Sequence, residues 1–182
     1  MVNEKYSVAE YERRFLLSDV PAGLSNPRQI SDLYIDGTRL RVRSVETPEG
    51  LVLQRKLGHR RRVAEEDPTV IWHTSLYLNE AEYEMLSSLP GRTLTKTRWT
   101  VDADGGSSSV DVFGGVLVGL VMLEVDLAHI DGLNAFTAPS WAGPDVTHNE
   151  TSTAGPLARL SADELEEALR RYEERRSPNP VQ

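Results

Sequence analysis

The sequence AEYERRFLL at residues 9–17 indicates the fold class of the whole chain. Side chains alternate between the two faces of a β-strand. Glu10, Glu12 and Arg14 therefore share one face of a predicted strand, while Tyr11 and Phe15 lie on the other. The same period of two residues recurs along most of the chain, so the sequence predicts a mainly β protein of the α+β class.

Turn signals such as Asp36-Gly37 and Pro90-Gly91 separate several segments with this period. The predicted strands span residues 9–17, 29–35, 38–44, 51–57, 70–78, 93–101, 107–113 and 117–127. This number and spacing predict an eight-stranded antiparallel β-barrel. Residues 79–89 and 161–176 each begin with a cap residue followed three positions later by Glu, which predicts two flanking helices. Residues 138–156, rich in Pro, Gly, Thr and Asn, predict a long loop.

Charged side chains gather on one face of nearly every predicted strand, and their sign changes from strand to strand. This face carries the acids Glu10, Glu12, Asp111, Glu124 and Asp126, and the bases Arg14, Arg39, Arg41, Arg43, Lys56, Lys96 and Arg98. One alternative is the wet outer face of a β-sandwich, but such a face usually mixes charges of both signs. Like charges placed two residues apart repel each other unless an opposite charge compensates them. The pattern therefore favours a charged face that lines the inside of the barrel.

A charged interior has to contain water and ions, because an unpaired buried charge costs several kcal/mol. Pairs of carboxylates suit a hard divalent cation such as Mg²⁺ or Mn²⁺. Guanidinium groups suit phosphate, to which they donate two parallel hydrogen bonds. The predicted ligand is a polyphosphate that carries a metal ion.

Length, charge and composition exclude several kinds of partner, site and membrane segment. The chain has 182 residues, a length that predicts one domain over residues 1–182. Its formal net charge of −8 argues against binding to a nucleic acid polymer or an anionic membrane. The absence of cysteine excludes disulfides, thiolate zinc sites and a cysteine nucleophile. The longest apolar run, residues 116–123, is far shorter than the ~20 residues that span a bilayer. Because no basic segment followed by an apolar one opens the sequence, we expect a cytoplasmic protein.

In their order along the chain, these residues resemble the CYTH superfamily, the triphosphate tunnel metalloenzymes. The opening stretch Glu10-Tyr11-Glu12-Arg13-Arg14 resembles the superfamily's Glu-x-Glu-x-Lys signature. The resemblance continues through Tyr34, Leu40-Arg41-Val42-Arg43, Lys56, Lys96-Thr97-Arg98, Val110-Asp111-Val112-Phe113, Leu123-Glu124-Val125-Asp126, the loop around Trp141 and Leu157-Ala158.

The resemblance implies an eight-stranded antiparallel β tunnel that acts on a triphosphate-containing small molecule with Mg²⁺ or Mn²⁺. It implies that metal is held by Glu10, Glu12, Glu124 and Asp126, with Asp111 nearby. It also implies that phosphates are bound by Arg14, Arg41, Arg43, Lys56, Lys96 and Arg98, with Arg39 near the tunnel mouth. Glu10, Glu12 and Arg14 would belong to the catalytic centre. Tyr34 either orients the attacking water there or, as is more common for a tyrosine at a strand edge, serves only in packing. A homodimer is one oligomeric state that the sequence leaves open.

Three departures from the superfamily's pattern involve four positions. Arg14 replaces a frequent Lys and cannot act as a base, and Asp126 replaces a usual Glu. His73 and Ser75 stand where relatives have two glutamates. The leading hypothesis is therefore a metal-dependent triphosphatase, with a non-catalytic polyphosphate- or nucleotide-binding module and a class IV adenylyl cyclase as alternatives. The basic run at residues 59–62, followed by acids at 65–67, predicts a solvated turn, with a phosphate-entry patch as the alternative.

Overall fold

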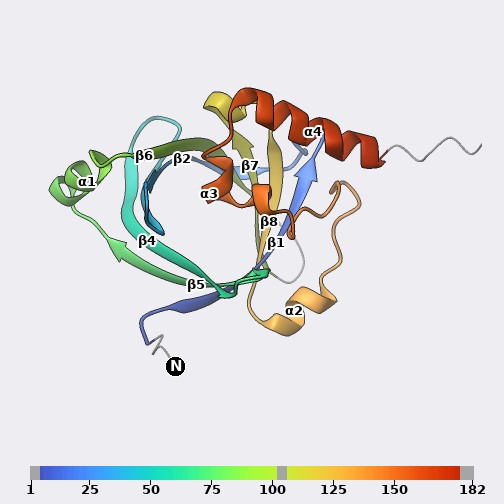
Figure 1. The fold of residues 1–182 in the computed structure, drawn as a ribbon, viewed down its shortest axis with the longest axis horizontal. Helices are drawn as coiled ribbons and strands as arrows, with labels where there is room; N and C mark the ends of the chain where they lie inside the picture. The colour runs from blue at the N-terminus through green and yellow to red at the C-terminus, as the bar shows by residue number, and fades with distance from the viewer. Residues whose placement is uncertain (1–4, 102–105, 177–182) are drawn as a thin grey trace, which may run out of the picture.

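The computed structural model describes residues 5–101 and 106–176, and its strands close into the barrel seen in Figure 1. The strands are β1 (Val8–Leu17), β2 (Ser25–Ile35), β3 (Leu40–Glu46), β4 (Val52–Ala64), β5 (Asp67–Tyr77), β6 (Gly91–Val101), β7 (Gly106–Phe113) and β8 (Val121–Leu127). Their order around the barrel is β1-β5-β4-β3-β2-β6-β7-β8. Every neighbouring pair is antiparallel. The predicted eight-stranded antiparallel barrel is confirmed.

The helices lie outside the barrel wall or across one of its ends. They are α1 (Glu80–Ser87), α2 (Ile130–Ala135), α3 (Ala154–Leu157) and α4 (Ala162–Arg176). Asn79 and Glu82 form the predicted capping box of α1, and Ser161 and Glu164 bond to each other's backbone N–H at the start of α4. Short 3₁₀ turns lie at Gly115–Leu117 and Glu150–Ser152. None of the helices in the described ranges is long and apolar enough to cross a membrane.

Several predicted boundaries were wrong. The strand β4 continues to Ala64, and Arg60 pairs with His73 across the sheet, so residues 60–62 are strand and not a solvated turn. The strand β3 begins at Leu40, which leaves Arg39 exposed in the preceding turn. The last strand begins at Val121, because Gly119 adopts the left-handed backbone (φ 97°) that ends the preceding turn. The helices α2 and α3 were missed, since six and four residues are too short to show a helical period.

The apolar residues form two separate clusters. One lies on the outer face of β1, β7 and β8, where Phe15, Val110, Leu123 and Val125 are covered by α2 and the chain that follows it. The ring of Phe136 packs against that of Phe15, with 5.9 Å between the centroids. The cluster accounts for the apolar half of the alternating pattern.

The second cluster fills one end of the barrel itself. It contains Leu94, Phe113 and Met122, with the partly buried Leu16 and Tyr34 packed against them. From outside, it is covered by Leu157, Ala158 and Leu165 of the α3–α4 segment. We call this cluster the apolar plug. It closes one end of the barrel, so the charged interior reaches from the plug toward the opposite end.

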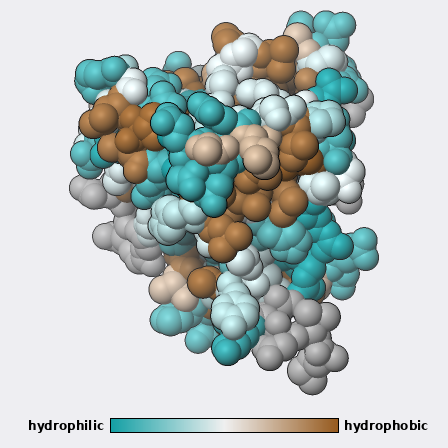
Figure 2. Space-filling view, turned by 90° about the vertical axis from the view of Figure 1, so that its left-hand side faces the viewer, coloured by the Kyte–Doolittle hydropathy of each residue, from teal (hydrophilic) through white to brown (hydrophobic). Residues whose placement is uncertain are grey.

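The face that carries α1 has a different surface. Figure 2 shows separate apolar patches there, broken by hydrophilic side chains. Leu53, Leu76 and Met85, from β4, β5 and α1, are among the exposed large apolar residues. On this side, little of the chain therefore covers the outer face of the barrel.

Candidate functional site

A charged cavity of about 190 Å³ occupies the interior of the barrel beyond the apolar plug. Its wall comes from β1, β3, β4, β5, β6 and β8, with Ala154 of α3 also contributing. The charged lining residues are Glu10, Glu12, Arg41, Arg43, Lys56, Arg60, His73, Lys96, Arg98, Glu124 and Asp126. The prediction that the charged face lines the inside of the barrel is confirmed.

The acidic side of this cavity lies where β1 pairs with β8. The register places Glu12 opposite Asp126 and Arg14 opposite Glu124. Glu12, Glu124 and Asp126 each offer one carboxylate oxygen, and these oxygens lie within 4.8 Å of one another. The buried guanidinium of Arg14 contacts Glu12 and lies 3.7 Å from Glu124. Arg14 thus fixes the direction of two of the three carboxylates.

Asp126 differs from the other acids on the cavity wall. Its side chain has no hydrogen bond or ion pair within the part of the chain that the structure describes, whereas Glu12 and Glu124 both contact Arg14. Burial, reinforced by the neighbouring charge of Glu124, raises the pKa of Asp126 to about 6. Three close carboxylates with one uncompensated charge are a donor set that fits a hard divalent cation.

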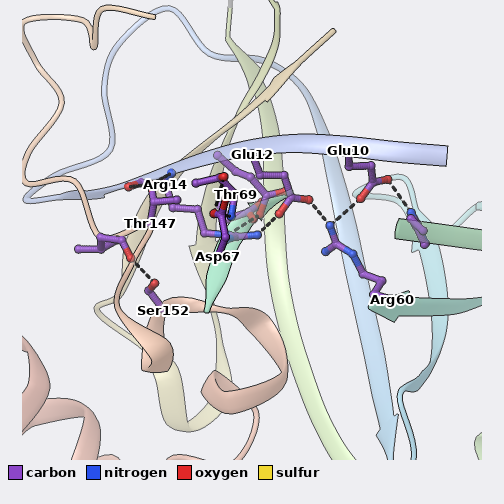
Figure 3. A network of polar contacts seen from close by, with 12 residues as sticks. Glu10, Glu12, Arg14, Arg60, Asp67, Thr69, Thr147 and Ser152 are labelled. Carbon is purple, nitrogen blue, oxygen red and sulfur yellow. Dashed lines mark hydrogen bonds and ion pairs between the residues drawn. The ribbon is translucent and has the colours of Figure 1, made fainter. Parts of the chain in front are cut away.

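Glu10 is held apart from this cluster by β4 and β5. Its carboxylate accepts a hydrogen bond of 2.6 Å from Arg60, and the other oxygen lies 2.5 Å from His73 Nδ1. The same Arg60 guanidinium also reaches Glu12, so it bridges the two acids of β1 (Figure 3). Ser75 Oγ lies 3.1 Å from His73 Nε2. His73 and Ser75 therefore form a chain of hydrogen bonds that ends on Glu10. The pKa of Glu10 is lowered to about 2, because the contacts with His73 and Arg60 outweigh the opposing effect of burial.

The basic side of the cavity is organised around Asp32, which the sequence reasoning missed. Asp32 is fully buried and accepts two hydrogen bonds from Arg43, at 2.6 and 2.7 Å. Arg41 lies 3.6 Å from the same carboxylate. One signal could have identified Asp32: it stands between Ile30 and Tyr34 on an otherwise apolar face of its strand.

This side carries more positive than negative charge. Asp32 is shared by two arginines, and the side chain of Lys56 makes no ion pair or hydrogen bond to any described residue. Burial and then the nearby Arg43 lower the pKa of Arg41 and of Lys56. Burial itself dominates both shifts, so each base is held charged in an unfavourable place. An anion in the cavity would relieve that cost.

Lys96, Arg98 and Asp111 form a third group, on β6 and β7. Arg98 donates two hydrogen bonds of 2.7 Å to Asp111 and one of 2.9 Å to Glu124. Lys96 contacts the same Asp111 carboxylate. Burial, followed by the charge of Arg98, lowers the pKa of Lys96 to about 8. Asp111 is thus fully engaged by bases and does not belong to the three-carboxylate cluster.

Comparison with known proteins agrees with this geometry. No family model matches the chain. An inorganic triphosphatase from Nitrosomonas europaea is 29% identical over 149 residues, which are 79% of this chain and 92% of the relative. A crystal structure of an inorganic triphosphatase superposes with a TM-score of 0.57 and 24% identity, covering 88% of this chain and 97% of that one. The relative and the shared fold support the CYTH resemblance of the sequence. A Bacillus halodurans protein described as a candidate adenylate cyclase shares the fold, with a TM-score of 0.51 at 10% identity, over 97% of this chain and 95% of that one.

Four predicted site residues do not line the charged cavity: Arg14, Tyr34, Arg39 and Asp111. Asp111 pairs with Lys96 and Arg98 instead of facing the carboxylate cluster. Tyr34 packs against the apolar plug, while its buried hydroxyl lies close enough to Asp32, Arg41 and Arg43 to interact with their charges. Arg39 was expected only near the tunnel mouth, and it lines the adjoining cavity beside α3. The other predicted metal and phosphate residues are brought together around the charged cavity.

Proposed function

We propose that this protein hydrolyses inorganic triphosphate inside the barrel, with Mg²⁺ or Mn²⁺ bound alongside the substrate. One observation carries the proposal: a single cavity has surplus negative charge at Asp126 and surplus positive charge around Arg41 and Lys56. A polyphosphate with a divalent cation supplies both missing charges at once. The similarity to an inorganic triphosphatase supports the same substrate.

The phosphates would lie against the basic side. Arg41, Arg43 and Lys56 face the cavity there, with Lys96 and Arg98 on β6, which β2 separates from β3. Asp32 holds the guanidinium of Arg43 by two hydrogen bonds before any ligand arrives. A donor fixed in advance loses little freedom on binding and is therefore an effective partner for phosphate.

The cation would be held by Glu12, Glu124 and Asp126, with Glu10 at the edge of the site. When bound, it would supply positive charge that offsets the negative charge of the substrate's phosphates. Arg14 orients Glu12 and Glu124 from behind and, being permanently protonated, takes no proton. His73 and Ser75, where the CYTH resemblance implies two glutamates, form instead a chain of hydrogen bonds that ends on Glu10.

Hydrolysis adds water to a terminal phosphorus and breaks its bond to the bridging oxygen, which releases orthophosphate and pyrophosphate. In phosphoryl transfer an enzyme contributes mainly by positioning the substrate and by neutralising charge on the phosphoryl oxygens. The fixed bases of β3, β4 and β6 would provide both.

The decisive experiment measures phosphate release from inorganic triphosphate, ATP and thiamine triphosphate, each with Mg²⁺ and with Mn²⁺, beside a thermal-shift assay. We expect release from inorganic triphosphate and a loss of metal-dependent activity in Glu12→Gln, with Glu84→Gln on the exposed α1 as the control. A thermal shift without release would favour the binding module. Formation of cyclic AMP from ATP would favour the cyclase. Neither shift nor release would reject the proposal.

A further inference from the structure

A serine, a histidine and a glutamate are joined by hydrogen bonds at one side of the charged cavity. Ser75 Oγ lies 3.1 Å from His73 Nε2, and His73 Nδ1 lies 2.5 Å from a carboxylate oxygen of Glu10. His73 lines the cavity, and Ser75 follows it by two positions on β5, so both side chains lie on the inner face. Glu10 comes from β1, which pairs with β5. We call these three residues the triad.

The contacts of Glu10 determine where the protons of the triad lie. Its other carboxylate oxygen accepts a hydrogen bond of 2.6 Å from Arg60. An ionised carboxylate can only accept, so His73 Nδ1 donates to Glu10. In a neutral imidazole this leaves the lone pair of Nε2 facing Ser75, whose hydroxyl donates to it. A nucleophile within reach of a base, which is itself oriented by a third group, is the arrangement that activates a serine.

Gly58 keeps space open beside the triad. It pairs with Ser75 on one neighbouring strand and with Arg41 on the other. A Cβ atom at Gly58 would lie 3.2 Å from His73 Nε2 and 3.7 Å from Arg41 Nη2. Gly58 is not one of the glycines with a positive φ, so a larger residue would change the space there and not the backbone conformation. The base and a cavity-lining arginine therefore converge on one open point.

The groups around this point favour a phosphoryl group as the electrophile. Arg41 and Lys56 face the cavity from the adjoining strands, and such bases match the oxygens and the charge of a phosphate. The oxyanion of acyl transfer is held instead by backbone N–H groups or by single side-chain donors. Ser75 is exposed, so water can reach it after a first transfer.

From this geometry, we propose that Ser75 is a nucleophile that takes the terminal phosphoryl group of the bound substrate. The proposal rests on the proposed function for the identity of that substrate. Ser75 Oγ bonds to the terminal phosphorus, and the bond from this phosphorus to the bridging oxygen breaks. His73 Nε2 takes the hydroxyl proton and gives it to the departing pyrophosphate. Water then attacks the phosphoserine, and His73 passes a proton from that water to Ser75 Oγ as orthophosphate leaves. Glu10 is the positioning residue that orients His73.

The first test follows a single turnover of inorganic triphosphate by the full chain. Pyrophosphate should appear before orthophosphate, and peptide mass spectrometry of acid-quenched protein should find phosphoserine at Ser75. Ser75→Ala should lower kcat by roughly 100-fold or more, with KM within about threefold, because Ser75 does not line the charged cavity. His73→Asn and the double variant should lose about as much, since the two residues act as a unit. Thr74→Ala, whose hydroxyl pairs with Ser7, is the control on the opposite face of β5.

The second test needs no triphosphate. The chain has no cysteine, so Ser75→Cys introduces a single thiol, and its alkylation by iodoacetate reports on activation at this position. A thiol beside an imidazole ionises more readily and reacts faster. Adding His73→Asn should therefore slow the alkylation about tenfold, whereas adding Thr74→Ala should leave it unchanged. Ser87→Cys, at the end of the exposed α1, gives the rate of an ordinary surface thiol.

Together the two tests separate this inference from the proposed function. Triphosphate hydrolysis in which both products appear together and no phosphoserine forms would overturn the inference and leave the proposed function standing. Equal alkylation with and without His73→Asn would also overturn it. Slower alkylation in His73→Asn, with no hydrolysis of triphosphate by the parent, would reject the proposed function and still support an activated Ser75.

Discussion

The two ends of the barrel interior are built by the same strands and differ in character. On β1 the inward positions pass from Glu12 and Arg14 to Leu16, and on β8 they pass from Asp126 and Glu124 to Met122. The strands β2, β6 and β7 make the same change, to Tyr34, Leu94 and Phe113. One end is therefore a charged cavity and the other is the apolar plug.

This difference separates stability from function. The plug buries apolar side chains against α3 and α4, and burial of that kind is the main favourable contribution to folding. The charged end opposes folding in part: burial lowers the pKa of Arg41 and raises that of Asp126, so both charges are held at a cost. The plug thus supports a cavity that is poorly stable by itself and suited to an ionic ligand.

The largest predicted effect comes from a substitution that disrupts the plug. Leu94 is 2% exposed inside it, and Leu94→Ala should lower the free energy of unfolding by about 2–5 kcal/mol, through lost burial and the cavity left behind. Urea unfolding of the unliganded protein measures this loss. Leu53→Ala on β4, where the side chain is 42% exposed, is the matched control and should change stability by less than about 1 kcal/mol. Equal losses would mean that the plug is not the main source of stability.

The next prediction concerns a substitution that removes one charge from the charged end. Arg41→Ala should raise KM for inorganic triphosphate by about 100-fold, because a charge-assisted contact with phosphate is lost. The same change should leave the melting temperature of the unliganded protein unchanged or higher. Arg41 is a buried base with a lowered pKa, and Asp32 keeps its two hydrogen bonds from Arg43. A clear fall in the melting temperature would contradict the idea that this charge opposes folding.

Most of the barrel could be predicted because the charge alternation is local and strong. The pattern at Glu10, Glu12 and Arg14 assigned the inward face, and the register confirms it. The plug could not be predicted from the sequence. Leu16 and Met122 follow the charged residues on the same strand face, and an apolar side chain there does not reveal whether it points inward or outward. Only the closing of the barrel decides that these side chains point inward.

The site was harder to predict where a residue depends on distant partners. Arg60 looked like part of a solvated turn, yet β4 continues far enough to bring it to Glu10 and Glu12, about fifty positions earlier in the chain. Asp32 was missed because its partners, Arg41 and Arg43, lie on the neighbouring strand. Arg39 was placed near the tunnel mouth from its spacing, and it lies in the turn before β3, where it lines the cavity beside α3.

The pH dependence of activity tests the role of Lys96, which is two residues from Leu94 of the plug on β6. Burial and Arg98 lower the pKa of Lys96 to about 8, against an ordinary value of ~10.4. Above pH 8 this phosphate-binding charge is lost, so kcat/KM for triphosphate should fall by about tenfold for each further pH unit. Lys96→Arg keeps its charge and should shift that fall to higher pH. The measurement is the pH profile of kcat/KM for both proteins.

Stability should change in the opposite direction over the same range. Between pH 8 and 10 the unfolded chain binds the Lys96 proton more tightly than the folded protein does, so the free energy of unfolding rises with pH. Lys96→Arg should lack this rise. If both proteins showed the same pH profile of activity and of stability, Lys96 would not be the titrating group.

The smallest predicted effect loosens the cover of the plug. The Ser161 hydroxyl accepts a hydrogen bond from the backbone N–H of Glu164 and so caps the first turn of α4. Leu165 of that helix packs against the plug. Ser161→Ala should lower the free energy of unfolding by about 1 kcal/mol, as loss of an N-cap does elsewhere. Ser161→Asp supplies another capping oxygen and should restore most of the loss. Because α4 lies outside the charged cavity, KM for triphosphate should not change in either variant. An increase in KM together with the stability loss would show that the two ends are coupled, and that the plug fixes the positions of the phosphate-binding side chains.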